Sequence, residues 1–377
     1  MSPIIRDTSE QTISEIFSLA DITVNGTRPW DIQVHRPEFY DLILCDGSLA
    51  LGESYMAGWW DCLSLDQFFF RVLSNDLEQK LKKSRSVILC SIKATLSNCQ
   101  NKKKAWEVGE KHYDAGNDLF ESMLDKHMAY SCAYWKNGTS DLNEAQEAKL
   151  ELICRKVKLQ PGMRVLDIGC GWGSFVRYAA QKYGVEAVGV TISKEQAKLA
   201  RERCAGLPID IRLLDYRDLD EEFDAIVSVG MFEHVGYKNY RQFMQIANRC
   251  LKPRALFLLH TIGSNYSTHH GDPWFDKYIF PNGMLPSIEQ LGKASENLFV
   301  MEDWHNISTH YDKTLTTWFA NFDQNWPKLQ DKYNDTFYRM WKYYLLSMAG
   351  SFRSRSIQVW QIVFSKGGTL GGYQNYL

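Results

Sequence analysis

Short apolar runs alternate with amphipathic helical runs along this chain, and the rhythm begins only after residue 160. The strand-like runs are rich in β-branched residues and lie at residues 163–168, 185–190, 209–214, 224–229 and 255–262. Helical spacing separates several of them, at residues 175–182, 194–204 and 240–251. Strands that alternate with helices form βαβ units, so the pattern predicts the α/β fold class with a mostly parallel, doubly wound, Rossmann-like sheet.

Three further segments continue the pattern toward the C-terminus. Residues 299–303 form a further short segment, and residues 314–350 are an aromatic-rich helical stretch. Residues 357–364 alternate between apolar and polar side chains, as a half-exposed strand does. We expect this last strand to run antiparallel at the edge of the sheet.

The first 100 residues lack the strand–helix rhythm, and we expect a smaller N-terminal domain that is mainly helical or mixed. An apolar segment from Gly47 to Asp61 ends in the pair Trp59 and Trp60, and three phenylalanines follow at residues 68–70. These aromatic side chains form either an apolar surface or a small core.

A basic stretch follows, with eight lysine or arginine residues and no acidic residue between Gln79 and Trp106. Its apolar residues recur close to a helical period, so it reads as a basic amphipathic segment that either lies on anionic lipid or packs between domains. A chain of 377 residues predicts two domains. We place a lipid- or membrane-engaging domain at 1–100, a basic linker and helix at 101–120, and a catalytic domain at 121–377.

Composition limits the classes of function. The net charge of −2 excludes a globally basic nucleic-acid binder. Nine cysteines without a CxxC pair or a signal peptide argue for reduced thiols and a cytoplasmic protein. No apolar run approaches the roughly 20 residues that span a bilayer, so any membrane role is expected to be peripheral.

A glycine-rich turn closes the first strand of the predicted sheet. Gly169, Gly171 and Gly173 alternate after Asp167, in a strand-to-helix turn where glycine allows positive φ and close approach of a ligand. The spacing differs from the G-x-G-x-x-G of dinucleotide enzymes, and no phosphate-loop lysine is present. The turn resembles motif I of the class I S-adenosylmethionine-dependent methyltransferases.

Other residues at strand ends extend this candidate cofactor site. Methyltransferases commonly place an acidic residue after the second strand to hold the ribose, whereas this chain has Thr191 and Gln196 there. Ser193 and Gln196 are also spaced as a helix-capping box, and both roles are compatible. The candidates for cofactor binding are Tyr130, Ser131, Asp167, Gly169, Cys170, Gly171, Trp172, Gly173, Thr191, Ser193, Gln196, Asp215, Tyr216 and Arg217.

Six motifs in order narrow the resemblance. They are Tyr130–Trp135, Gly169–Gly173, Gly230–Gly236, His260–Gly263, Tyr278–Gly283, and Asp303–His305 with Tyr311. Together they resemble the cyclopropane-fatty-acyl-phospholipid synthase family, over nearly the whole chain. The N-terminal segment from Gly52 to Trp60 is similar to that of the phospholipid enzymes rather than that of the shorter mycolic acid synthases.

The resemblance implies a seven-stranded methyltransferase sheet and S-adenosylmethionine as co-substrate. It also implies transfer of a methylene group to the cis double bond of an acyl chain in a membrane phospholipid. It further implies that a bound bicarbonate deprotonates the carbocation. This bicarbonate would be held by Cys132, Glu233, His260, the backbone of Ile262, and Tyr311. His260 and Glu233 both follow sheet strands at the cofactor edge, where His, Tyr and a backbone N–H suit an oxyanion.

The partner expected from this resemblance is a membrane surface, which the protein would contact peripherally from the cytoplasmic face. A homodimer through the N-terminal domain would cover the aromatic side chains there. Aromatic walls suit a cation, and Trp172, Tyr134, Trp135 and Phe232 are candidates for this role, although core packing explains any one of them.

Alternatives remain open at this point. Cys132, Glu233 and His260 could ligate zinc, but their scattered spacing does not support it, and we expect no metal. Cys132 and His260 could also form a nucleophilic pair, although alkene methylation gives a thiol no task. Two rival functions remain. One is another methyltransferase that acts on lipid or small amine substrates, and the other is a lipid-binding protein with a degenerate cofactor fold.

Overall fold

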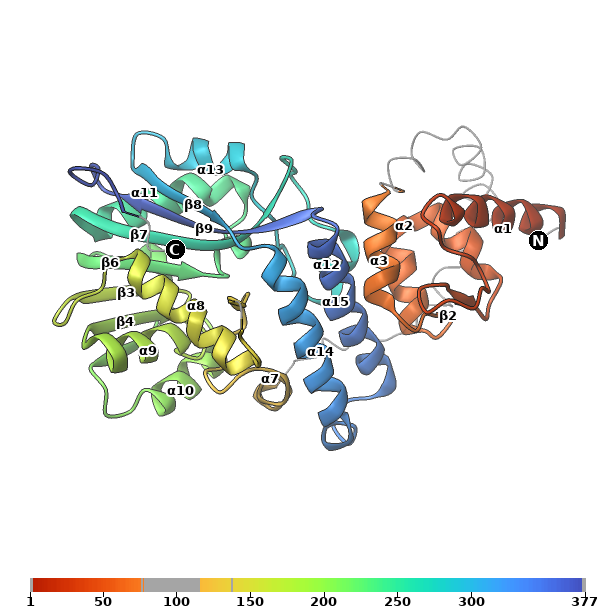
Figure 1. The fold of residues 1–377 in the computed structure, drawn as a ribbon, viewed down its shortest axis with the longest axis horizontal. Coiled ribbons are helices and arrows are strands. Elements are labelled where there is room, and N and C mark those ends of the chain that lie inside the picture. The colour runs from red at the N-terminus through yellow and green to blue at the C-terminus, as the bar shows by residue number, and fades with distance from the viewer. Residues whose placement is uncertain (1–2, 76, 78–115, 137, 375–377) are drawn as a thin grey trace. The chain divides into compact units, whose positions relative to one another are not determined.

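The computed structural model describes residues 3–75, 77, 116–136 and 138–374, which form two compact units (Figure 1). Unit 1 combines residues up to 116 with 272–281 and 318–356, and unit 2 combines 117–271, 282–317 and 357–377. The sequence analysis predicts a domain at 1–100, a linker and helix at 101–120 and a catalytic domain at 121–377. The observed division differs because two later helical segments pack with the N-terminal helices rather than with the sheet.

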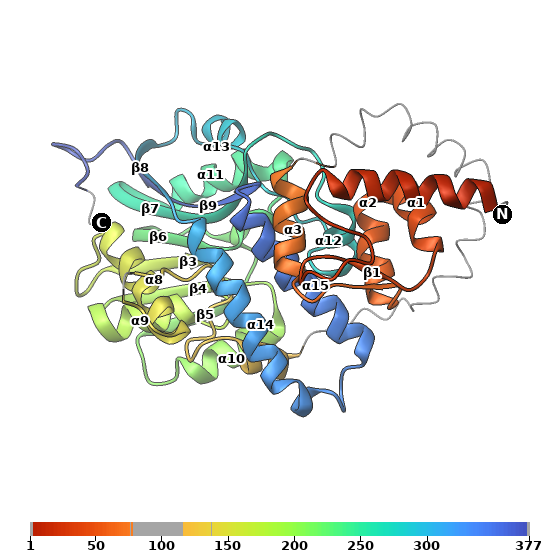
Figure 2. The ribbon, with the colours of Figure 1, turned by 45° about the vertical axis from the view of Figure 1, so that its right-hand side comes forward.

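Unit 2 contains a seven-stranded sheet with the order β5-β4-β3-β6-β7-β9-β8 (Figure 2). Its strands are β3 (Arg164–Ile168), β4 (Glu186–Thr191), β5 (Ile209–Leu213), β6 (Phe223–Val229), β7 (Leu251–Ser264), β8 (Val300–Asn306) and β9 (Ile357–Ser365). The first five are parallel, and β9 is antiparallel to both β7 and β8. The predicted α/β fold class and seven-stranded sheet are therefore confirmed.

The prediction for the last strand was wrong in one respect. β9 lies between β7 and β8, so the edge strand on that side is β8. Eight of the nine residues of β9 are buried, including Gln358 and Gln361, whose polar character had indicated a half-exposed strand. Both glutamines bond to polar groups on neighbouring elements, which the alternation along one strand does not reveal.

Helices cover both faces of the sheet (Figures 1 and 2). On one face pack α8 (Leu142–Lys156), α9 (Ser174–Tyr183) and α10 (Lys194–Arg203). On the other face pack α11 (Tyr240–Cys250) and α13 (Ile288–Ser295). The helices predicted at 175–182, 194–204 and 240–251 thus end within one residue of their observed bounds.

Unit 1 is mostly helical. Its elements are α1 (Pro3–Ser18), β1 (Gln33–Val34), α2 (Glu38–Met56), β2 (Trp60–Asp61), α3 (Leu65–Ser74), α12 (Pro273–Tyr278) and α15 (Asp335–Arg353), with the later part of α14 (Thr309–Leu329). The predicted helical stretch at 314–350 is thus two helices, because the chain turns between residues 330 and 334.

The N-terminal aromatic side chains form a small core rather than a surface. Trp60 and Phe68 are fully buried, with ring centroids 5.4 Å apart, and Tyr55 lies 5.0 Å from Trp60. Tyr343 of α15 covers this cluster, 5.7 Å from Tyr55 and 5.1 Å from Phe69. These aromatic side chains are thus covered within the unit.

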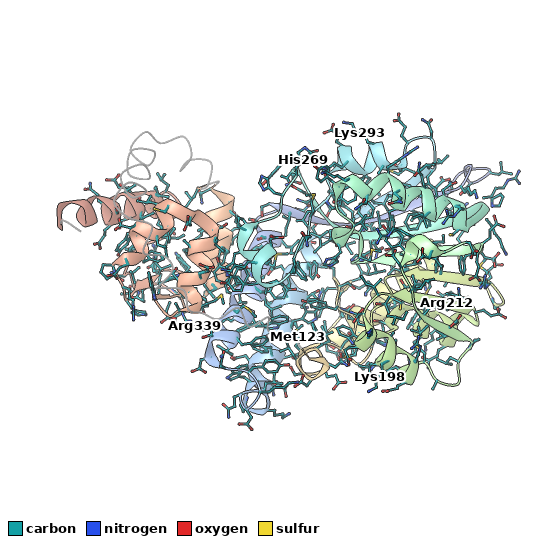
Figure 3. All side chains as sticks on the ribbon, turned by 180° about the vertical axis from the view of Figure 1, so that it is seen from behind. Met123, Lys198, Arg212, His269, Lys293 and Arg339 are labelled. Atoms are coloured by element: carbon teal, nitrogen blue, oxygen red, sulfur yellow. The ribbon has the colours of Figure 1, made fainter. Side chains whose placement is uncertain are left out.

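Two glycines of unit 1 allow helices to approach closely. A Cβ on Gly52 of α2 would lie 2.3 Å from the Trp274 ring, and a Cβ on Gly350 of α15 would lie 2.6 Å from the Cβ of Phe69. Arg339, labelled in Figure 3, donates to the Tyr55 carbonyl and to the Asp61 carboxylate. These contacts explain why the later helical segments belong to this unit.

The predicted basic segment at 79–106 and most of the predicted linker at 101–120 lie outside the described residues. Among the helices that the structure describes, none combines the length and apolar character needed to cross a membrane. Seven cysteines lie in the described part of the chain, and none of these seven forms a disulfide.

Candidate active site

The glycine-rich turn follows β3 at the point where the sheet order reverses between β3 and β6, which is where ligands bind in open α/β sheets. Gly169, Gly171 and Gly173 all have positive φ, at 86°, 53° and 82°. A Cβ on Gly169 would collide with the Met231 side chain, whereas a Cβ on Gly171 would enter open space. The turn therefore leaves room for a ligand directly against the backbone of Gly171.

Asp167 closes β3 beneath this turn and is only 2% exposed. Its Oδ1 has no hydrogen-bond partner among the described residues. Burial raises the pKa of Asp167 to about 7, and the nearby Lys149 partly opposes the shift. A buried carboxylate oxygen without a donor fits a ligand that brings one, such as the ammonium group of S-adenosylmethionine.

The end of β4 brings Thr191, Ser193 and Gln196 together. The Thr191 hydroxyl lies 3.0 Å from Gln196 Oε1 and accepts from the Ser193 N–H at 3.2 Å. Ser193 caps α10 by accepting from the Gln196 N–H at 3.3 Å. The capping half of the prediction is confirmed, while the Gln196 side chain turns to Thr191, so both predicted ribose contacts lie side by side.

The residues after β5 are engaged with one another. Asp215 caps a short 3-10 helix at Tyr216–Asp218, accepting from the Arg217 N–H at 3.0 Å and from the Arg217 guanidinium at 2.9 Å. This ion pair holds the pKa of the Asp215 carboxyl below its usual value. The Tyr216 ring packs 5.3 Å from the Phe243 ring, between this loop and α11.

Aromatic side chains support the glycine turn from α7 (Asn117–Met123). Trp172 donates to Asn117 at 3.0 Å, and its ring lies 4.8 Å from Phe120, which also packs 5.0 Å from Tyr130. Cys170 is buried beside the turn, and burial raises its pKa well above the usual value. Trp172 is therefore packed and hydrogen-bonded within the turn that would hold the cofactor.

Glu233 and Ile262 are joined directly. Glu233 lies in the 3-10 helix Phe232–His234 that follows β6, and its Oε1 accepts the Ile262 N–H at 2.6 Å. Glu233 Oε2 is buried without a hydrogen-bond partner in the described part of the chain. Burial raises the pKa of Glu233 to about 7, and the Ile262 N–H lowers it in part. The backbone N–H predicted to bind an oxyanion is thus used by Glu233 itself.

His260 stands in a polar row across three strands. The register pairs it with Gln361 of β9, which in turn pairs with His305 of β8. Gln361 Nε2 lies 3.3 Å from His260 Nδ1. Burial, with smaller contributions from Lys149 and Lys156, holds the pKa of His260 well below its ordinary value. His260 is therefore a neutral imidazole at physiological pH, and an Nδ1 that accepts from Gln361 leaves its proton on Nε2.

Cys132 lies against the start of α14, the helix that also carries Tyr311. Thr314 Oγ1 accepts from the Ala133 N–H at 3.2 Å, and Cys132 Sγ lies 3.9 Å from the Ile307 carbonyl. Tyr311 is buried in the first turn of the helix. Complete burial raises the pKa of Cys132 far above its ordinary value, so the side chain is a neutral thiol. A neutral thiol is a weak donor rather than a nucleophile.

The sequence matches the family described as mycolic acid cyclopropane synthetase over residues 100–362. The chain belongs to this family. It is 55% identical over 354 residues to the cyclopropane-fatty-acyl-phospholipid synthase of Escherichia coli strain K12, across 94% of this chain and 92% of that protein.

Two solved structures of this family share the fold. One is the cyclopropane synthase MmaA2 from Mycobacterium tuberculosis, with a TM-score of 0.64 and 32% identity over 68% of this chain and 96% of that chain. The other is the mycolic acid cyclopropane synthase CmaA1 complexed with SAH and CTAB, with a TM-score of 0.63 and 36% identity over 68% of this chain and 96% of that chain. The enzyme class predicted from the motifs, an S-adenosylmethionine-dependent methyltransferase, is confirmed.

Two buried lysines of α8 were missed by the sequence analysis. Lys149 donates to Ser131 Oγ at 2.8 Å, and Lys156 pairs with Asp303 at 3.1 Å. Both side chains belong to a stripe that includes Gln146 and is fully covered by its surroundings. The available signal was their spacing, since Gln146, Lys149, Ile153 and Lys156 recur at intervals of three and four residues, on a single helix face.

The aromatic candidates for cation shielding differ in their surroundings: Phe232 lies in the hydrophobic core, whereas Tyr134 and Trp135 lie beside polar side chains. Phe232 stacks on Tyr240 at 4.4 Å and is fully buried in the hydrophobic core, so its role is packing. Tyr134 is partly exposed, with its ring 5.9 Å from His305 and 4.9 Å from His310. Trp135 donates to Thr314 and faces Lys313, whose Nζ lies 4.1 Å from the ring centroid.

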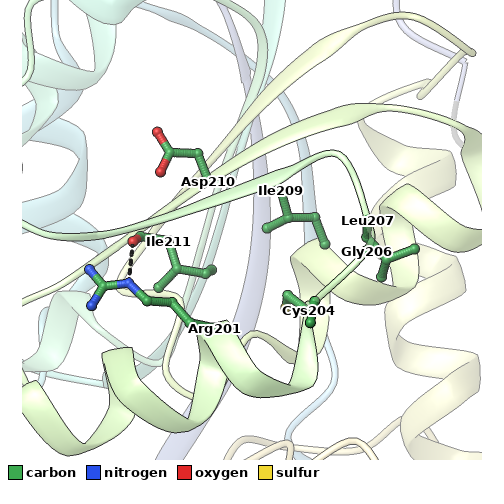
Figure 4. A pocket seen from close by; sticks show the side chains of 8 residues that line it. Arg201, Cys204, Gly206, Leu207, Ile209, Asp210 and Ile211 are labelled. Atoms are coloured by element: carbon green, nitrogen blue, oxygen red, sulfur yellow. Dashed lines mark hydrogen bonds between the residues drawn. The ribbon is translucent and has the colours of Figure 1, made fainter.

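A hollow beside β5 is separate from these groups. It is lined by residues from the end of α10 and the start of β5, including Cys204 and Asp210 (Figure 4). Arg201 at its rim donates to the Ile211 carbonyl at 3.0 Å. The hollow lies at the amino end of its strand, whereas the glycine turn lies at the carboxyl end of β3. None of its lining residues is among the candidates for cofactor binding or catalysis.

Proposed function

We propose that this chain transfers a methylene group from S-adenosylmethionine to the cis double bond of unsaturated acyl chains in membrane phospholipids, forming cyclopropane rings. The observation that carries the proposal is the 55% identity to the Escherichia coli cyclopropane-fatty-acyl-phospholipid synthase over 92% of that protein. This alignment covers most of this chain, 94% of it, and not only the methyltransferase sheet.

The cofactor supplies an electrophilic methyl group, and this chain's residues bind it and control protons and water. The backbone of Gly169–Gly173, the carboxylate of Asp167, and the pair Thr191 and Gln196 would hold it, with Ser193 capping the helix behind them. Asp215, Tyr216 and Arg217 would bound the adenine end, and Tyr130, Ser131, Cys170 and Trp172 would support the turn.

Ring formation needs a base only after the alkene has reacted. The π electrons of the double bond form a bond to the methyl carbon as its bond to sulfur breaks, and S-adenosylhomocysteine leaves. Loss of one methyl proton then supplies the electron pair that closes the ring. Water would trap the cation as an alcohol, so a buried site without a charged nucleophile suits this chemistry.

Bicarbonate as the base fits the charge states of the buried groups. His260 and Cys132 are neutral donors, Tyr311 adds a hydroxyl, and Glu233 is the acceptor for a bicarbonate O–H. In our proposal the Ile262 N–H acts through Glu233, because it already donates to Oε1. Glu233 Oε2 is the oxygen left for the anion. We propose no metal in this reaction.

We further propose that the enzyme works at the cytoplasmic face of the membrane as a peripheral protein, with the N-terminal region engaging lipid. The basic residues between 79 and 106 carry this part of the proposal, since each adds about 1 kcal/mol of attraction to an anionic surface. Reversing the charges of Lys102, Lys103 and Lys104 should weaken sedimentation with anionic vesicles at low salt. Unchanged sedimentation would refute this part.

The reaction is tested by incubating the enzyme with methyl-labelled S-adenosylmethionine and vesicles of an unsaturated phospholipid. Label in a saturated, ring-bearing acyl chain is the expected result, and Glu233→Gln is the matched variant that should lose it. Label in a methyl-branched or hydroxylated chain, or in a small amine, would identify a different methyltransferase. Absence of saturable cofactor binding would refute any methyltransferase.

A further inference from the structure

Lys149 is a buried charge in unit 2 that the proposed reaction does not use. It projects from α8, is 2% exposed, and its Nζ donates to Ser131 Oγ at 2.8 Å. Burying a lysine is costly unless it is paired, because the charged form loses its hydration. The charged form of Lys149 therefore depends on the groups that surround it.

Two carboxylates act on Lys149, and they differ in their partners. The oxygens of Asp125 accept the N–H groups of His127 and Ala129, both at 2.9 Å. Asp167 has no such pairing, since its Oδ1 is buried without a hydrogen-bond partner among the described residues. Asp167 is thus the carboxylate whose charge depends on Lys149 and on a ligand.

We propose that Lys149 is a positioning residue for cofactor binding, which keeps Asp167 ionised and holds Ser131 in place beside the glycine turn. The ionised carboxylate then accepts a hydrogen bond from the ammonium group of the cofactor. The inference rests on the proposed function in taking S-adenosylmethionine as the ligand. Lys149 touches neither substrate nor the reacting atoms in this assignment.

The second contact of the α8 stripe supports the same role. Gln146, one turn earlier, donates to the Ala129 carbonyl at 3.2 Å and to the Ser131 carbonyl at 2.9 Å. Together with the bond from Lys149, these two bonds hold residues 129–131, which precede Cys132, against α8. Lys149 thus interacts both with this segment, through Ser131, and with the Asp167 carboxylate near the end of β3.

The titration of nearby groups agrees with this geometry. Burial lowers the pKa of Lys149 to about 8, with Asp125, Cys132 and Asp167 opposing the shift, while the pKa of Asp167 is about 7. The other titratable groups facing this cluster are Cys170 of the turn and His260 of β7. The thiols of Cys132 and Cys170 and the imidazole of His260 are neutral near pH 7. Within this cluster, Asp167 and Lys149 are therefore the two groups whose charge changes near that pH.

The test is the affinity for S-adenosylhomocysteine, measured by calorimetry between pH 6.0 and 8.5. With a pKa of about 7 for Asp167, wild-type affinity should fall about tenfold from pH 8 to pH 6, because the carboxylate becomes protonated. Lys149→Met should shift this midpoint upward by about one pH unit and therefore weaken binding about threefold at pH 7.5. Lys149→Arg should keep the wild-type midpoint.

Lys156→Met is the matched control, because Lys156 is equally buried on the same helix and pairs with Asp303 instead. Its binding profile should keep the wild-type midpoint. Asp167→Asn should flatten the profile, and adding Lys149→Met to it should weaken binding less than twofold further. Circular dichroism of each variant identifies any that fails to fold.

Two results would overturn the proposal: an unshifted midpoint in folded Lys149→Met, or an equally large Lys149→Met effect in the Asp167→Asn background. Either would leave the proposed function intact if the wild-type enzyme still forms labelled cyclopropane. Failure of the wild-type enzyme to bind S-adenosylhomocysteine would instead count against the proposed function.

Discussion

The buried carboxylate of Glu233 makes a prediction about stability that is independent of turnover. Its pKa rises from 4.5 to about 7 because burial disfavours the charged form. The folded protein therefore holds this proton more tightly than the unfolded chain does. Stability from this group is fully present below pH 4.5 and is lost as the pH rises toward 7. Above pH 7 the wild-type enzyme carries an ionised carboxylate that its surroundings do not fully compensate.

The magnitude follows from the two pKa values. Between pH 5 and pH 8, this single group should lower the free energy of unfolding by about 2.5 kcal/mol. Glu233→Gln removes the titration and keeps an oxygen that accepts the Ile262 N–H. The variant should therefore gain about 2.5 kcal/mol relative to the wild-type protein over this pH range, while it loses ring formation.

The assay is urea denaturation of both proteins at pH 5, 6, 7 and 8, followed by circular dichroism. The difference between the two proteins at each pH isolates the titration of Glu233 from that of all other groups. A difference that stays constant from pH 5 to pH 8 would show that the carboxylate is not buried as described. A difference that grows in favour of the wild-type protein would show that a partner stabilises the ionised form.

Three further predictions concern the glycines and the thiol. Gly171→Ala should weaken S-adenosylhomocysteine binding at least tenfold in calorimetry. The control Gly184→Ala, at a similar positive φ but away from the turn, should leave binding unchanged and lower the free energy of unfolding in urea by about 1 kcal/mol. Gly263→Ala should destabilise unit 2 by about 3 kcal/mol in urea, because its Cβ would lie 2.0 Å from the Trp360 ring. Cys132 should resist iodoacetamide at pH 8 at least a hundredfold more than an exposed thiol, measured by mass spectrometry; rapid alkylation would restore the nucleophilic interpretation.

The sheet was predictable because its signal is local. The central parallel strands β3 and β6 are buried on both faces and therefore read as apolar runs, and the intervening helices have their own period. The prediction for β9 was wrong because its glutamines bond to residues fifty or more positions away, and alternation alone cannot distinguish solvent from a buried polar partner. The assignment of residues 318–356 differed for a related reason, since their apolar faces pack on helices from the start of the chain.

The candidate site was predictable where a residue lies at a strand end, and less so elsewhere. Glu233 follows from that rule because it comes just after β6, whereas His260 lies inside β7, opposite Val229 at the end of β6. Lys149 and Lys156 do not, since lysines on an amphipathic helix are ordinarily solvated. The hydrogen bond from the Ile262 N–H to Glu233 could not be predicted either, because it joins two segments that only the folded structure places side by side.

The buried charges of unit 2 are compensated in a way that suits a cationic intermediate. Lys149 faces Asp167 and Lys156 pairs with Asp303, and the charge of each lysine also helps to keep His260 neutral. An uncompensated lysine would repel a carbocation, whereas an uncompensated carboxylate would attract and trap it. Neutral donors such as His260 and Cys132 avoid both effects, while Asp167 and Glu233, each with a pKa of about 7, are buried acids whose charge can respond to a ligand.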